Sequence, residues 1–162
     1  MKNIATNKLD YSGVVTLSTR IGSKKVQLKN VNNSGNSQLF DFLSDCLVGN
    51  FDTAKLTMPA MIKLLNKNDE GGYTSASGFV YLRSMPEKII DPKSNSCIVV
   101  YSFEIPYDQV IKAGPFSHIG LYSANSRVSD IENYSAICEV NVAENSISSV
   151  LLVDWKLTIE NR

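Results

Sequence analysis

The stretch Ser149–Glu160 reads SVLLVDWKLTIE and decides the class of fold. From residue 151 to residue 159 every second side chain is apolar, and after residue 152 the side chains between them are polar or charged. Successive side chains of a β-strand point to opposite faces of a sheet, so the pattern predicts a strand with one buried and one exposed face. Trp155 falls on the apolar side and is predicted to point into the core.

Similar strand patterns recur through most of the chain. Runs rich in β-branched and aromatic residues are bounded by turn residues, at spacings typical of sandwiches and barrels. Besides 149–160, the predicted strands cover residues 14–18, 25–29, 55–58 with 61–65, 73–85 centred on 79–82, 97–105, 117–123 and 133–142, with a short one through 89–90. We therefore expect a mainly β fold, an antiparallel β-sandwich or barrel-like domain of about eight strands. No strand–helix–strand alternation indicates a parallel sheet.

One helix is predicted, over Gln38–Val48. Ser37 is placed to cap its start and Gly49 its end, where a left-handed residue is favoured. Its apolar stripe is Leu39, Phe40, Leu43, Cys46 and Leu47, with Asp41, Ser44 and Asp45 facing away. Trp155 is predicted to pack against Leu39 and Leu43 of this helix or against the strand CIVVY, residues 97–101. The connector 107–115 has room for a further helical turn.

The length and composition fit one domain. We expect residues 1–10 to form a loosely ordered arm and residues 11–162 a single β-rich domain. Apolar residues make up 43% and charged residues 20% of the 162, which argues against wholesale disorder. No apolar run is long enough to span a membrane, and residues 1–13 lack the apolar centre of a signal peptide. Lys24-Lys25 is the densest basic cluster, so the sequence predicts neither nucleic-acid nor membrane binding.

The charges are unevenly distributed along the chain. Residues 1–67 hold nine Lys or Arg against four Asp or Glu, and residues 68–162 hold seven against twelve. One interpretation is a bipolar surface that favours head-to-tail contacts. The second interpretation, which the sequence favours, is that both halves of the chain interleave in the sheets, so that their charges mix.

No residue pattern predicts catalysis, a metal site or a cofactor. His118, the single histidine, lies in an apolar strand, and its default role is a histidine bonded to backbone or water. A nucleophile–base pair would need a Ser, Cys or Thr beside it in space. The three cysteines, Cys46, Cys97 and Cys138, fit no zinc spacing and suit small buried side chains, although one disulfide remains an alternative. No phosphate-binding or nucleophile-elbow motif occurs.

Tyrosines are the most suggestive side chains for binding, because they bury area and keep a polar group. Tyr73, Tyr107 and Tyr122 lie near predicted loops, where their rings could stack on sugars. Tyrosines are also ordinary members of sheets. A carbohydrate- or receptor-binding module is therefore kept as an alternative function.

Two stretches show a family resemblance. Residues 13–65 contain a strand pair, GVVTLSTRIGSKKVQLKN, followed by QLFDFLSDCLVGNF and KLTMPAMIKLL, and the second stretch is SSVLLVDWKLTIEN at residues 148–161. This arrangement resembles small virion structural proteins of low-GC short-tailed bacteriophages, of the head-associated or fibre-associated class. The two stretches cover about two-fifths of the chain, and residues 66–147 match no family in the same way.

The resemblance implies a β-rich, non-enzymatic protein without a cofactor, present in many symmetric copies. Its partners would be copies of itself and other virion structural proteins, with an auxiliary capsid, collar or fibre-base role. Its location would be the virion, after assembly in the cytoplasm of the bacterial host. An enzyme that uses His118 is the third hypothesis.

Overall fold

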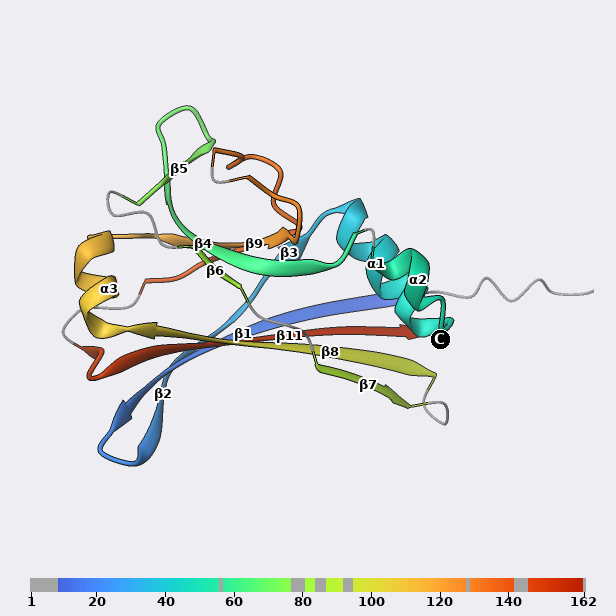
Figure 1. Cartoon of the computed structure of the whole chain (residues 1–162), viewed down its shortest axis with the longest axis horizontal. Coiled ribbons are helices and arrows are strands. Elements are labelled where there is room, and N and C mark those ends of the chain that lie inside the picture. Colours follow the sequence, from blue (N-terminus) through green and yellow to red (C-terminus); the bar gives the residue numbers. More distant parts are fainter. Residues whose placement is uncertain are drawn as a thin grey trace, which may run out of the picture.

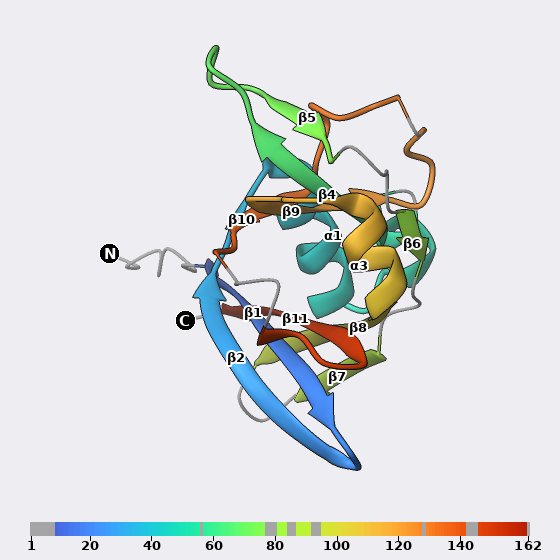
Figure 2. The same ribbon diagram turned by 90° about the vertical axis from the view of Figure 1, so that its left-hand side faces the viewer.

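The computed structural model describes residues 9–55, 57–76, 81–83, 87–91, 95–127, 129–141 and 146–161. Two antiparallel sheets face each other, with helices closing the space between them at both ends (Figures 1 and 2). The prediction of a mainly β, sandwich-like fold is confirmed. The predicted arm at residues 1–10 lies outside the described residues except for Leu9 and Asp10, which already belong to a strand.

The first sheet has the strand order β2-β1-β11-β8-β7. The strands are β1 (Leu9–Ile21), β2 (Lys24–Asn32), β7 (Glu87–Asp91), β8 (Ser96–Pro106) and β11 (Val150–Asn161). β11 lies at the centre, where it pairs with β1 from Leu9↔Asn161 to Thr19↔Leu151 and with β8 on its other side. The chain thus brings its first and last described strands together.

The alternation along β11 has the predicted consequence. Its apolar positions are fully buried in the main core, whereas Asp154 and Thr158 are half-buried and Lys156 is exposed on the outer face. Trp155 has no exposed surface and stands directly opposite Tyr101 of the CIVVY strand. The predicted inward orientation of Trp155 is confirmed, and Leu39 and Leu43 belong to the same core.

The second sheet has the order β3-β10-β9-β4-β5, and β6 also pairs with β4. Its strands are β3 (Ser34–Gly35), β4 (Pro59–Lys67), β5 (Tyr73–Ser75), β6 (Tyr81–Arg83), β9 (His118–Ser123) and β10 (Ala136–Glu139). Every residue of β4 from 59 to 65 is buried. Ile62 and Leu64 face the main core, whereas Met61 and Leu65 face outward and join Tyr122 and Ile137 in a second, smaller cluster. We call these four residues the outer cluster.

Helix α1 (Ser37–Leu47) lies between the sheets at one end, close to its predicted bounds (Figure 2). The cap is Asn36 in place of Ser37, since the Asn36 side chain accepts a hydrogen bond from the Leu39 N–H at 3.0 Å. Gly49 follows the helix with φ +79°, the left-handed conformation expected of it. The buried face includes Phe42, which the predicted stripe omitted, while Phe40 and Leu47 are only half-buried.

Some predicted elements need correction. The strand over residues 55–58 is wrong: the short helix α2 (Phe51–Ala54) is followed by a turn in which the Thr57 N–H bonds the Ala54 carbonyl, and β4 begins at Pro59. The turn in the 107–115 connector is a full helix, α3 (Tyr107–Ala113). Strand β10 is shorter than the predicted 133–142. The predicted strand centre at residues 79–80 and the predicted turn at 143–145 lie outside the described residues.

Candidate functional site

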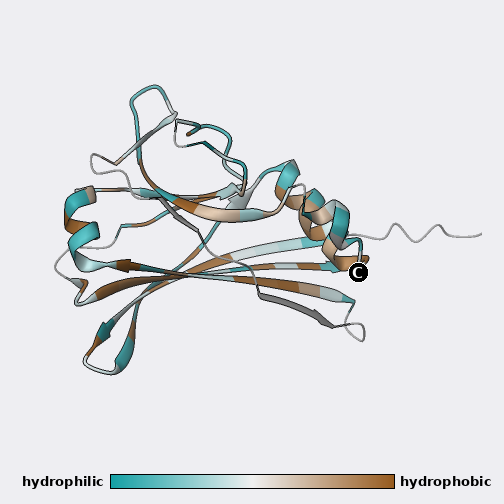
Figure 3. Ribbon diagram, in the orientation of Figure 1, coloured by the Kyte–Doolittle hydropathy of each residue, from teal (hydrophilic) through white to brown (hydrophobic). Residues whose placement is uncertain are grey.

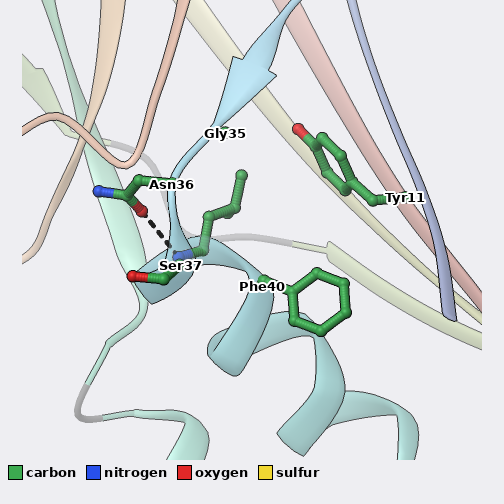
Figure 4. Close-up of a pocket in the computed structure, with 6 residues that line it drawn as sticks. Tyr11, Gly35, Asn36, Ser37 and Phe40 are labelled. Carbon is green, nitrogen blue, oxygen red and sulfur yellow. Dashed lines mark hydrogen bonds between the residues drawn. The ribbon is translucent and has the colours of Figure 1, made fainter.

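A groove at the α1 end of the sandwich is hollowed around Tyr11 (Figure 4). One cavity of about 240 Å³ lies between Tyr11 and the start of α1, and its walls are Tyr11, Gly35, Asn36, Ser37, Leu39 and Phe40. Two further hollows, of about 270 and 420 Å³, share Tyr11 and extend along β1 to Asp10. The groove therefore adjoins the start of the described chain.

Uncharged side chains line the first cavity of this groove. Tyr11 is the titratable side chain in the wall of the first cavity, and burial raises the pKa of its phenol to about 12, so it remains protonated at neutral pH. The Asn36 carboxamide is already engaged with the helix start and with the Tyr134 carbonyl. The walls of the first cavity can hold an apolar or weakly polar group, Ser37 contributes a hydroxyl there, and Asp10 and Glu160 contribute carboxylates to the hollow beyond Tyr11.

Asn33 ties this end of the sandwich together. With its amide oriented to match its neighbours, Asn33 accepts from the Trp155 indole N–H at 2.5 Å and donates to Tyr11 Oη and the Gly13 carbonyl, both at 3.0 Å. The buried indole N–H thereby gains the partner that a buried Trp needs. A Cβ at Gly13 would lie 1.6 Å from the end of the Asn33 amide, so a larger residue there would displace the Asn33 side chain.

The outer face of the second sheet carries a second candidate surface. The loop formed by residues 124–135, of which residue 128 is not described, lies over this face together with the β4–β5 hairpin (Figure 1). Tyr73, Ile131 and Tyr134 are half-buried against the outer cluster, and the Tyr73 and Tyr134 rings meet edge to face at 5.7 Å. Exposed Asp69, Glu70 and Glu132 border them. We call these six residues the outer patch.

His118 lies beside this patch, on β9. Its Nδ1 is 2.8 Å from the Ser117 hydroxyl, and its ring meets Tyr73 edge to face at 5.0 Å. Burial lowers its pKa, so the ring is neutral at neutral pH. The serine that a nucleophile–base pair would need is thus present. However, His118 does not line any of the three hollows around Tyr11.

The predicted sugar-stacking tyrosines have different positions. Tyr122 has no exposed surface, and its hydroxyl donates to the Ile131 carbonyl at 2.6 Å, so it cannot stack on a ligand. Tyr73 is half-buried in the outer patch, and Tyr107 is half-buried at the start of α3. The structure therefore places Tyr107 apart from the other two, and it packs Tyr73 against the cluster that contains Tyr122 and against Tyr134, which the sequence did not single out.

Lys63 is the main functional side chain that sequence reasoning missed. It is fully buried in β4 and donates to Ser126 Oγ at 2.9 Å, the Arg127 carbonyl at 2.7 Å and the Asp130 carbonyl at 2.5 Å. Its ammonium also lies 4.0 Å from the centre of the Tyr122 ring. Burial lowers its pKa, while Asp130 opposes that shift. One buried cation thus fixes the loop that carries the outer patch, and the only sequence signal was a lysine inside an apolar run.

The β1–β2 hairpin forms a third exposed feature. Its turn projects beyond the sandwich, on the face opposite the β4–β5 turn (Figures 1 and 2). Ile21 at this turn is 59% exposed. Arg20, Lys24 and Lys25 surround it, and Arg20 and Lys25 pair with Glu104 and Asp154 at 2.9 and 2.8 Å. We call residues 20–25 the hairpin tip.

The three cysteines are free and buried, so the predicted role as small buried side chains is confirmed. Within the described ranges, no group of three or more His, Cys, Asp or Glu side chains is placed to hold a metal ion. Among the same residues, no helix has the length and apolar character to cross a membrane. Comparisons with protein-family models, with curated proteins and with solved structures found no match.

Proposed function

We propose that this chain is a non-enzymatic structural component of a bacteriophage virion. It would bind other virion proteins as an auxiliary capsid, collar or fibre-base protein, in many copies. Its location would be the particle, after assembly in the host cytoplasm. Contacts would form through surface complementarity and would require no cofactor.

One observation carries this proposal. The two stretches that resemble small virion proteins, residues 13–65 and 148–161, are far apart in sequence, yet β1, β2 and α1 of the first stretch pack with β11 of the second, while β4 lies in the other sheet. β1 and β11 pair in register along most of their length, and α1 contacts β11 and β8 from within the sandwich. Trp155 and Asn33, one from each stretch, are joined by a hydrogen bond. Because β1, β2, α1 and β11 pack together, the resemblance supports the proposed virion role more strongly than it would if the two stretches made no contact.

The experiment is to purify particles from the phage that encodes the chain and to identify their proteins by mass spectrometry. We expect the protein in purified particles at a fixed copy number relative to the major capsid protein. Detection in the lysate but never in particles would contradict the proposal.

The contact between Ser117 and His118 is the observation that most favours the hypothesis of an enzyme. A serine hydroxyl 2.8 Å from a neutral imidazole nitrogen has, in the tautomer that lets the hydroxyl donate, the arrangement of an activated nucleophile. We assign His118 a packing role against Tyr73 instead. A fluorophosphonate probe tests this assignment, because it labels activated serines. We expect no labelling of Ser117, whereas labelling that disappears in His118→Gln would favour a hydrolase.

A carbohydrate- or receptor-binding module remains the second candidate. The half-buried Tyr73 and Tyr134 rings of the outer patch favour it, because partly exposed aromatic rings can stack on sugars. A glycan array distinguishes the two proposals. Binding that Tyr134→Ala abolishes would favour the module, and an array without hits would remove it.

A further inference from the structure

The hairpin tip combines an apolar centre with a basic rim. Ile21 is exposed between Arg20 and the two lysines of the turn. Arg20 and Lys25 are partly neutralised by their ion pairs, whereas Lys24 is exposed and has no acidic partner among the described residues. Tips with an exposed branched aliphatic side chain and a nearby cation suit an apolar surface bordered by carboxylates.

The outer patch offers such a surface. Its apolar part consists of Tyr73, Ile131 and Tyr134, which present the outer edge of a small core. Asp69 and Glu70 stand exposed at the adjoining turn and form no ion pair within the described residues. The patch is also fixed in place, since Glu132 accepts from the Tyr73 N–H at 3.2 Å and Lys63 holds the underlying loop.

The two surfaces cannot meet within one molecule. The hairpin tip projects below the first sheet and the β4–β5 turn projects above the second sheet, and both views of the fold agree on this (Figures 1 and 2). The ion pairs Arg20–Glu104 and Lys25–Asp154 join the two halves of the chain, as the interpretation of mixed charges expects, and they leave Lys24 as the unpaired base of the hairpin tip among the described residues. The turns that carry Lys24 and the carboxylates of Asp69 and Glu70 therefore lie on opposite faces of the sandwich.

We propose that the hairpin tip of one copy of this chain docks on the outer patch of a second copy. The contact joins two different surfaces, so it is heterologous and propagates into a ring or a filament unless closure stops it. Ile21 packs against the Tyr73 and Tyr134 rings, while Lys24 faces Asp69 and Glu70. This inference rests on the proposed role as a subunit of an assembly and specifies the contact that the subunit makes.

The test uses two variants with one altered surface each. Ile21→Glu with Lys24→Glu reverses the hairpin tip, and Asp69→Lys with Glu70→Lys reverses the turn of the outer patch. Lys112→Glu, an exposed lysine of α3 outside both surfaces, is the control. Light scattering over a concentration series measures the mass of each protein, and circular dichroism verifies that each is folded.

The wild type and the Lys112→Glu control should gain mass with concentration, and salt should weaken the association because it screens the charges. Each double variant alone should lose self-association, with a dissociation constant raised about tenfold or more. An equimolar mixture of the two variants should associate again, because each then offers a surface complementary to the other. That recovery also excludes misfolding as the cause of the loss.

Three results would overturn the inference: a wild-type protein that stays monomeric at every concentration, association that either double variant leaves intact, or a mixture that fails to recover. None of them would by itself remove the proposed virion role. The copy number in purified particles tests that role separately, so a protein found in particles but monomeric in solution would leave the function standing without this contact.

Discussion

β11 and β4 occupy comparable places in the two sheets, since each has paired strands on both sides and each contributes to the main core. They differ in what covers their second face. The outer face of β11 is open and carries Asp154, Lys156 and Thr158, whereas the outer face of β4 is covered by the loop 124–135 and the outer cluster. Figure 3 shows the same contrast in hydropathy along the two sheets.

The two strands are also stabilised in different ways. β11 depends on one large side chain, Trp155, and on the hydrogen bond from its indole to Asn33. β4 is apolar on both faces and depends on the opposite device, a buried cation whose three donors are all satisfied.

Truncation of the large side chain on β11 should cost most. Trp155→Ala removes a fully buried ring and leaves Asn33 without its donor, so we expect a loss of about 3–5 kcal/mol in the free energy of unfolding. Urea denaturation followed by circular dichroism measures this loss, because the only tryptophan is gone. Trp155→Phe, which keeps much of the volume, should lose less. A mutant that unfolds like the wild type would refute the core position.

Removal of the Lys63 charge on β4 should lower the free energy of unfolding less than Trp155→Ala does, and its effect should be concentrated in the loop 124–135. Lys63→Met keeps the apolar stem and leaves the Arg127 and Asp130 carbonyls without a donor, so we expect a loss of about 1–3 kcal/mol. Amide hydrogen exchange should rise in the loop 124–135. Lys67→Met, on the exposed end of the same strand, is the matched control and should change stability by roughly 0.5 kcal/mol at most. Equal effects of the two mutations would contradict the assigned role of Lys63.

Alkaline pH should destabilise both regions through their tyrosines. Burial raises the pKa of Tyr11, beside β11, to about 12, and it also raises the pKa of Tyr122, beside β4. Above pH 10, the unfolded chain loses these phenolic protons first, so stability falls as the pH rises. Tyr11→Phe and Tyr122→Phe should each reduce this fall in urea titrations between pH 9 and 11, conditions chosen around the ordinary tyrosine pKa of about 10. An unchanged slope in both variants would contradict the burial of these phenols.

The smallest effect is expected from His118. Burial lowers its pKa below the ordinary 6.5, so as the pH falls through 6.5 the unfolded chain takes up the proton first and stability decreases. His118→Gln should flatten the pH dependence of stability in that window while leaving the neutral-pH stability nearly unchanged. The charges facing this ring are Glu139 and Lys67, and Glu139→Gln should deepen the acid loss, since Glu139 favours the protonated ring.

β11 and β4 also differ in how much of their structure their sequences predict. The alternation of β11 predicts both the strand and its buried face, because one open face leaves polar residues at regular positions. β4 gives only a short apolar run, which does not reveal that a distant loop covers its outer face. Strands β3, β5 and β6 have two or three residues each, too few to show any period. Hence more strands form than the eight expected.

The candidate surfaces were harder to predict, since they depend on contacts between distant segments. Asn33 is one of several asparagines in a polar loop, and its position beside the indole follows only from the pairing of β1 with β11. Tyr134 meets Tyr73 because Lys63 fixes the loop 124–135, which carries Tyr134. The prediction that Tyr122 could stack on a sugar is wrong, because its position in a short apolar strand does not distinguish a buried ring from an exposed one.

The pairing of β1 with β11 has a consequence for biosynthesis. Roughly 130 residues separate the partners, and at about 5–20 residues per second a ribosome needs on the order of ten seconds between making the first and making the second. During that time the β1–β2 hairpin exposes the edge of β1 that β11 later covers, in addition to the edge of β2, and strands of other nascent chains could add there. Arg20, Lys24, Lys25 and Lys29 on this hairpin then act as gatekeepers that oppose aggregation until β11 arrives.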